Sequence, residues 1–141
     1  MRDLHNQVAV RHTLAPATHT TTATGASVDR RGFESVDHAV TLGASGDTLS
    51  PSVSITLRLE HSHDGVSWEA ATDADALGPT LGAAGAFAVI NDPAEDGTTY
   101  RVGYVGGRRY SRVVADFSGV HASGTPLAAL ALLGHAHMRP V

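Results

Sequence analysis

The sequence predicts an all-β protein, an antiparallel β-sandwich of about eight short strands with extended terminal arms, forming one domain over residues 1–141. Three observations predict this fold. A run near the middle of the chain alternates apolar and polar residues almost perfectly. Fifteen glycines and six prolines punctuate the chain at short intervals, which favours short strands and turns over long helices. The length of 141 residues is that of one domain with one core.

The first three strands are expected at residues 6–14, 32–42 and 52–61. The last of these, SVSITLRLEH, is the clearest, because four apolar residues share one face and five polar residues share the other. The apolar residues are Val53, Ile55, Leu57 and Leu59, and the polar ones are Ser52, Ser54, Thr56, Arg58 and Glu60. In residues 6–14 Val8 and Val10 share a face, and in residues 32–42 Val36, Val40 and Leu42 do so. Such alternation is typical of antiparallel sheets with one face on the core and one in water.

The second half of the chain predicts a loop and three further strands. Residues 73–85 read as a loop with one helical turn near Asp73 to Leu77, and residues 86–90, AFAVI, as a short buried strand. Residues 99–105 and 109–117 are two β-rich runs that flank Gly106 and Gly107. A glycine pair between two such runs predicts a β-hairpin.

The last expected strand covers residues 126–138, PLAALALLGHAHM. Alanine and leucine favour helix, so the assignment rests on the strand-rich context. Leu127, Leu133 and His135 would share one face, and Leu130 and Leu132 the other. A strand that is apolar on both faces is predicted to be central in its sheet or covered.

The motif His61-Ser62-His63-Asp64 has two interpretations. Two imidazoles on one strand face can chelate zinc, with His135 or His137 as a third ligand. Alternatively, Ser-His-Asp-Gly forms a turn, since aspartate and glycine tolerate its unusual backbone dihedrals, and Trp68 then begins the return strand. We favour the turn, and accordingly predict no catalytic, cofactor-binding or metal-binding residues and no cofactor.

The segment YRVGYVGGRRYSR, residues 100–112, contains all three tyrosines and four of the ten arginines. Interleaved aromatic and basic residues can bind nucleic acid, and the same residue types are enriched in protein interfaces. A plain β-structure with solvated arginines is the third interpretation. The formal net charge of −4 argues against a general polyanion-binding protein, so no nucleic-acid partner is expected.

Other classes lack their sequence signals. The chain has no cysteine, and therefore neither a disulfide nor a thiolate metal site. It has no lysine for a phosphate-binding loop, no G-x-S-x-G and no His-Glu-x-x-His. The N-terminal residues lack the apolar stretch of a signal peptide and no segment approaches a membrane span, so function without export and without a membrane is expected.

Five blocks carry a resemblance to a known group. They are RDLHNQVAV (2–10), VDRRGFESVDHAV (28–40), HDGVSWEAA (63–71), YRVGYVGGRRYSRVV (100–114) and LLGHAHMRPV (132–141). In this order, and over nearly the whole chain, they resemble a group of small tailed-bacteriophage virion proteins.

The resemblance implies a non-enzymatic structural protein of the virion, assembled in the bacterial host cytoplasm. It implies a capsid decoration (cement) protein that binds the major capsid protein on the outer head shell and stabilises it. Self-association as a trimer or other small oligomer is also expected, because so few aromatic residues contribute to the core. The alternatives are a tail or head-to-tail connector protein, a carbohydrate- or receptor-binding module that uses Trp68 and the tyrosines, and a histidine-metal hydrolase.

Overall fold

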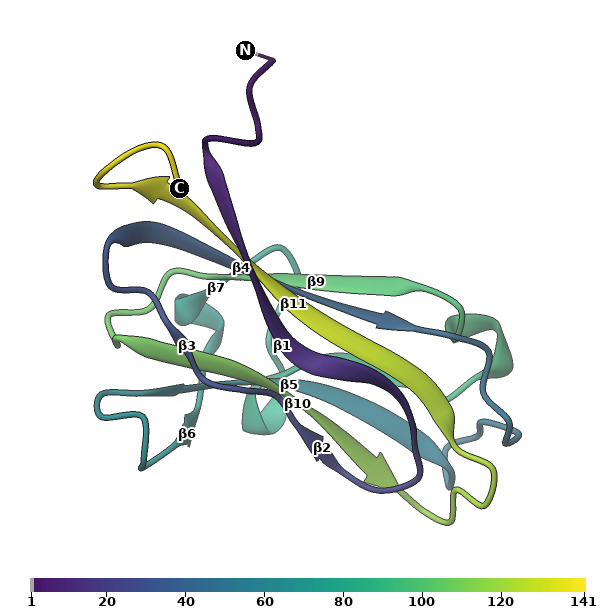
Figure 1. Cartoon of the computed structure of the whole chain (residues 1–141). Helices are drawn as coiled ribbons and strands as arrows, with labels where there is room; N and C mark the ends of the chain where they lie inside the picture. Colours follow the sequence, from purple (N-terminus) through teal and green to yellow (C-terminus); the bar gives the residue numbers. More distant parts are fainter. Residues whose placement is uncertain (1) are drawn as a thin grey trace.

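The computed structural model describes residues 2–141 and contains two antiparallel β-sheets that pack face to face (Figure 1). The five-stranded sheet has the strand order β1-β11-β4-β9-β7. In the six-stranded sheet the order is β2-β10-β5-β6, with β3 also paired to β10 and β8 also paired to β5. The predicted all-β antiparallel sandwich is therefore confirmed.

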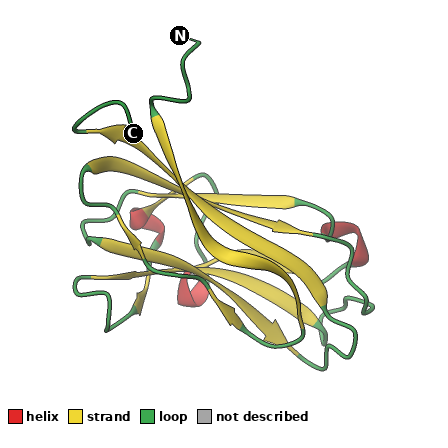
Figure 2. Ribbon diagram, viewed as in Figure 1, coloured by secondary structure: helices red, strands yellow, loops and turns green. Residues whose placement is uncertain are grey.

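Strands make up most of the described chain (Figure 2). The five-stranded sheet consists of β1 (Val8–His19), β11 (Thr125–Ala136), β4 (Phe33–Leu42), β9 (Thr99–Tyr104) and β7 (Ala76–Leu77). The six-stranded sheet consists of β2 (Ala23–Thr24), β10 (Tyr110–Ser118), β5 (Ser54–Ser62), β6 (Glu69–Ala70), β3 (Val28–Asp29) and β8 (Ala86–Ile90). Three short 3-10 helices lie in the connections: η1 (Asp73–Asp75), η2 (Ala83–Gly85) and η3 (Pro93–Glu95).

All seven predicted strands are present, and the predicted helical turn is η1. The three strands that the sequence did not predict, β2, β3 and β7, have two residues each, as does β6, the return strand expected at Trp68. Within residues 2–141, no helix has both the length and the apolar character needed to cross a membrane.

The core lies between the sheets and follows the alternation of the sequence. On β5, Ile55, Leu57 and Leu59 are fully buried, and Val36 and Val40 on β4 are buried opposite them in the other sheet. Burial of one such side chain contributes about 1.5–3 kcal/mol to folding. The intervening residues of β5 point away from the core, which confirms the predicted two-faced strand.

β11 is the central strand that its apolar composition predicts. It lies between β1 and β4, and Leu127 and Leu133 on its inner face are buried. Leu130 and Leu132 lie on its outer face, and Leu130 is 38% exposed. The prediction of a central position is confirmed, whereas the outer face of the strand is not fully covered.

The predicted hairpin at Gly106 and Gly107 is wrong. β9 belongs to the five-stranded sheet and β10 to the six-stranded sheet, so the glycines connect the two sheets. Tyr104 explains the path: its ring is buried, and its hydroxyl accepts a hydrogen bond of 3.1 Å from the Arg108 N–H. A Cβ on Gly106 would lie 2.6 Å from the Tyr104 hydroxyl, so only glycine lets the chain pass over the ring.

The two terminal segments differ from each other. Residues 2–7 lead away from the sandwich, and Leu4 within them is 70% exposed (Figure 1). The C-terminal segment folds back beside the start of β4, because the His137 N–H donates a 2.9 Å hydrogen bond to the Gly32 carbonyl. The N-terminal segment thus projects from the sandwich and contains a turn, in which the Gln7 N–H donates a 3.1 Å hydrogen bond to the Leu4 carbonyl. The C-terminal segment is attached at its first residue.

Candidate protein-binding face

The His-x-His-Asp motif forms a turn, as favoured from the sequence. Asp64 accepts hydrogen bonds from the N–H groups of Val66 and Ser67, at 2.8 and 2.9 Å, and from the Ser62 hydroxyl. These bonds lower the pKa of Asp64 to about 2. Gly65 has a φ of +75°, which glycine adopts without strain. The return strand, β6, begins one residue after Trp68, at Glu69.

The histidines of the zinc hypothesis do not come together. His61 continues the buried face of β5, and its Nδ1 lies 3.0 Å from the Tyr104 hydroxyl. His63 is exposed in the turn. His135 contacts the Ser35 hydroxyl and His137 contacts Glu34, both on β4 of the other sheet. Among residues 2–141, no three His, Cys, Asp or Glu side chains are grouped closely enough to hold a metal ion.

The arginines of residues 100–112 all form ion pairs. The pairs are Arg101 with Asp37, Arg108 with Glu69, Arg109 with Asp29, and Arg112 with Glu60. Two aromatic rings are also engaged: the Arg109 guanidinium lies 5.0 Å from the centre of the Tyr110 ring, and that of Arg112 lies 4.1 Å from the Trp68 ring. These cation–π contacts occupy ring faces that a base or a sugar would need.

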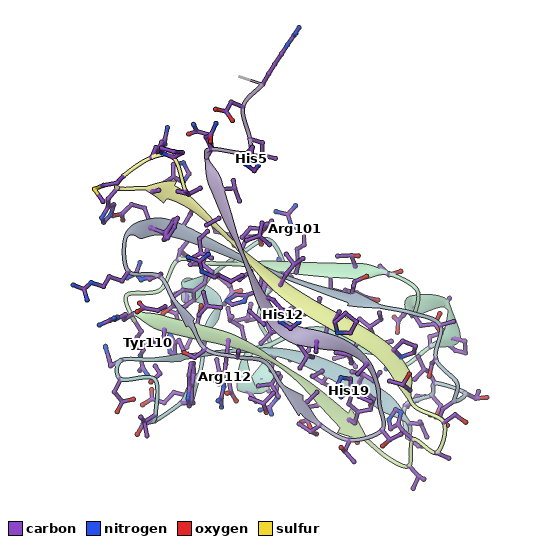
Figure 3. All side chains as sticks on the ribbon, in the orientation of Figure 1. His5, His12, His19, Arg101, Tyr110 and Arg112 are labelled. Atoms are coloured by element: carbon purple, nitrogen blue, oxygen red, sulfur yellow. The ribbon has the colours of Figure 1, made fainter. Side chains whose placement is uncertain are left out.

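The outer face of the six-stranded sheet is charged and internally paired. Glu60 on β5 lies 2.7 Å from Arg112 on β10 and 3.8 Å from Arg58, and Arg58 lies 3.7 Å from Asp116. Figure 3 shows Tyr110 and Arg112 on this sheet and His12 on the opposite one. The charged side chains of this face thus pair with one another.

The outer face of the five-stranded sheet is different, because apolar side chains run across it. We call this surface the apolar face, and it consists of Val8, Val10 and Leu14 on β1, Ala128, Leu130 and Leu132 on β11, Ala39 on β4 and Leu77 on β7. Val10 is 58% exposed and Leu77 is 61% exposed. The apolar face carries one ion pair at its β9 side, between Arg101 and Asp37.

Two hollows shape the apolar face. One is lined by Leu4, Val8, Leu77 and Leu132 among others, and the second by residues that include Leu14 and Leu130. Polar residues, among them His12, Thr41 and Asp37, also line these hollows. Clusters of exposed apolar side chains with polar residues at their margins mark interaction sites in soluble proteins. Each half-exposed leucine or valine covered by a partner would contribute roughly 1 kcal/mol to binding.

The sequence contained part of the signal for the apolar face. Leu130 and Leu132 stood out as the second apolar face of their strand, although the sequence could not tell whether another element covered them. Val8 and Val10 share a face, as predicted, but that face points outward, and Ala9 and Thr13 are the buried residues of β1. Leu77 lay in a predicted loop and was missed, because a two-residue strand such as β7 has no periodicity.

No protein-family model matches the chain, and no curated protein sequence matches it.

Proposed function

We propose that this protein is a non-enzymatic structural protein of a tailed-bacteriophage virion, which binds the outer shell of the head through its apolar face and stabilises that shell. Its partner would be the major capsid protein. The proposal joins the resemblance of the sequence blocks to phage virion proteins with the character of this surface.

The contrast between the two outer faces carries the proposal. One sheet presents paired charges such as Arg112 and Glu60, and the other presents Val10, Leu77 and Leu130. An antiparallel sheet with a solvated outer face alternates apolar and polar residues, as β5 does. β11 departs from this pattern on its outer side, and covering that side with another protein would remove its apolar surface from water.

A shell-binding protein can work with modest affinity for each copy. Many copies bind a symmetric shell, and contacts between neighbouring sites add to the stability of the whole assembly. A rigid sandwich suits this role, because its binding surface is preformed and loses little conformational freedom on binding.

The proposal is tested with phage heads that lack the protein. Purified protein is added back, bound protein is quantified after sedimentation of the heads, and the heads are heated. We expect saturable binding, added density on the outer surface in electron micrographs, and a higher disruption temperature. Heads that bind no protein, or whose disruption temperature is unchanged at saturation, would rule the proposal out.

A further inference from the structure

β1 is the long open edge of this sandwich. The opposite edge of the five-stranded sheet, β7, has two residues. In the six-stranded sheet the outer strands β2, β3 and β6 also have two residues each, and β8 has five. β1 has twelve. Very short edge strands are a common protection against unwanted strand pairing, and β1 lacks that protection.

The second half of β1 is protected in other ways. Its register with β11 shifts between His12 and Leu14 and again between Leu14 and Ala17, and Pro16 lies in the same stretch. The Thr13 carbonyl also accepts a 2.7 Å hydrogen bond from the Ala26 N–H. Bulges, proline and covering segments all prevent an edge from accepting another strand.

The first half, residues 8–12, has none of these features. It pairs with β11 in continuous register, from Val8 opposite Gly134 to His12 opposite Leu130, and no strand of residues 2–141 lies on its other side. Every second residue of an edge strand directs its N–H and C=O groups outward, where they can pair with another strand.

We infer that residues 8–12 of β1 pair antiparallel with the same residues of a second copy of this chain, about a two-fold axis at Val10. The two five-stranded sheets would then form one continuous sheet. The pairing covers Val8 and Val10 at the edge of the apolar face and leaves its residues on β11, β4 and β7 open, so this inference goes beyond the proposed binding to a phage head and does not depend on it.

Charge and side-chain direction determine the register in which a second copy of β1 can pair with the first. Directly opposite residues in an antiparallel pair must lie on the same face, so a two-fold pairing is centred on a single residue. A centre at Arg11 or at His12 would place two cationic or titratable side chains opposite each other. A centre at Ala9 would place Arg11 opposite Gln7, which precedes the strand.

A centre at Val10 avoids these conflicts and uses all five residues. It places Val10, which is 58% exposed, against its counterpart, Arg11 opposite Ala9, and His12 opposite Val8. No cation opposes another. Cross-strand pairs of β-branched residues stabilise a sheet by about 0.2–1 kcal/mol each, so burial of Val10 against Val10 favours this register.

A dimer requires more contact than the five paired residues alone. Five paired residues extend for about 17 Å. A stable interface needs about 800 Å² from each partner, more than a strand pair alone supplies. The N-terminal arm, with Leu4 at 70% exposed, lies directly before β1 and can add to the contact.

The absence of cysteine makes a direct test available. Val10→Cys places one thiol at the two-fold axis of the purified protein, where opposite Cβ atoms approach to about 4.5–5.5 Å, close to the distance that a disulfide requires. We expect rapid, nearly complete disulfide-linked dimer on mild oxidation. Val66→Cys and Val120→Cys are matched controls, since these valines are 81% and 82% exposed and lie outside the strands. Crosslinking of Val10→Cys no faster than these controls would overturn the inference.

A second variant tests how much Val10 contributes to the stability of the dimer. Sedimentation equilibrium should show a dimer of the unmodified protein, and Val10→Lys should raise its dissociation constant about tenfold or more, because like charges then face each other across the axis. Val120→Lys should leave the constant unchanged. A protein that is monomeric at about 100 μM, a concentration at which even weak dimers are populated, would overturn the inference, as would a dimer that Val10→Lys does not weaken. Strand pairing only in the presence of phage heads would assign the edge to a different protein and also overturn it.

Discussion

Lowering the pH from 7.5 to 5 should reduce the free energy of unfolding by about 2 kcal/mol through one side chain, the buried His38. His38 lies on β4 with its side chain between the sheets, where its Nε2 is 2.8 Å from the Ser111 hydroxyl on β10. Its Nδ1 is buried and has no hydrogen-bond partner in the described part of the chain. Burial lowers the pKa of His38 from 6.5 to about 4, because an imidazolium there would lose its hydration.

The sign follows from proton binding in the two states. Above pH 6.5 His38 is neutral in both the folded and the unfolded chain, so it contributes no pH dependence. Below pH 6.5 the unfolded chain binds a proton that the folded chain excludes, and stability falls until the pH reaches about 4. The loss by then totals about 3 kcal/mol. Burial also lowers the pKa of His61, which adds a loss in the same direction.

Denaturant unfolding at pH 7.5, 6.5 and 5 measures this effect. His38→Gln keeps a polar group for Ser111 but does not titrate, so the variant should lose most of the slope between pH 7.5 and 5. His63→Gln is the control, since His63 is exposed, and it should keep the slope. A His38→Gln variant with the slope of the unmodified protein would show that His38 takes up its proton in the folded state.

Gly85→Ala should destabilise the protein by about 3 kcal/mol or more, the sum of backbone strain and a steric clash. Gly85 has a φ of +75°, and a Cβ there would lie 2.4 Å from the Leu59 carbonyl oxygen and 3.2 Å from that of Ala71. Both contacts are with backbone, which cannot rotate away as a side chain can. The glycine thus allows η2 to approach β5 at the edge of the core.

Gly78→Ala separates the effect of backbone strain from that of the steric clash. Gly78 has a φ of +101°, but a Cβ there would meet no atom within 4 Å. Its substitution should therefore cost only the backbone strain, about 1–2 kcal/mol. Equal destabilisation by the two substitutions, measured by denaturant unfolding, would show that the close approach at Gly85 is unimportant.

The sequence predicted the strands well where burial of one face makes apolar and polar residues alternate along the strand. β5 alternates because one of its faces is buried, and its limits were predicted within two residues. Asp64 and Gly65 predicted their turn because both residues have a local backbone role there. In these segments local preference and tertiary environment agree.

The sequence did not predict which sheet each strand joins or which side of the sheet each strand face occupies. Gly106 and Gly107 look like a hairpin turn, and only the buried Tyr104 ring beneath them explains why the chain changes sheets. The outward direction of Val8 and Val10 is likewise set by the pairing of β1 with β11. Alternation shows which residues share a face, but not which side of the sheet that face occupies.

Binding of two matched variants to phage heads tests the role of the apolar face most directly. Leu130→Asp places a carboxylate at a 38% exposed position on the apolar face, and Val89→Asp places one at a 48% exposed position on β8 of the other sheet. We predict that Leu130→Asp weakens binding about tenfold or more, the cost of burying one unpaired charged group, while Val89→Asp binds like the unmodified protein. Full binding by Leu130→Asp, with both variants folded, would contradict the assignment of the apolar face as the binding surface.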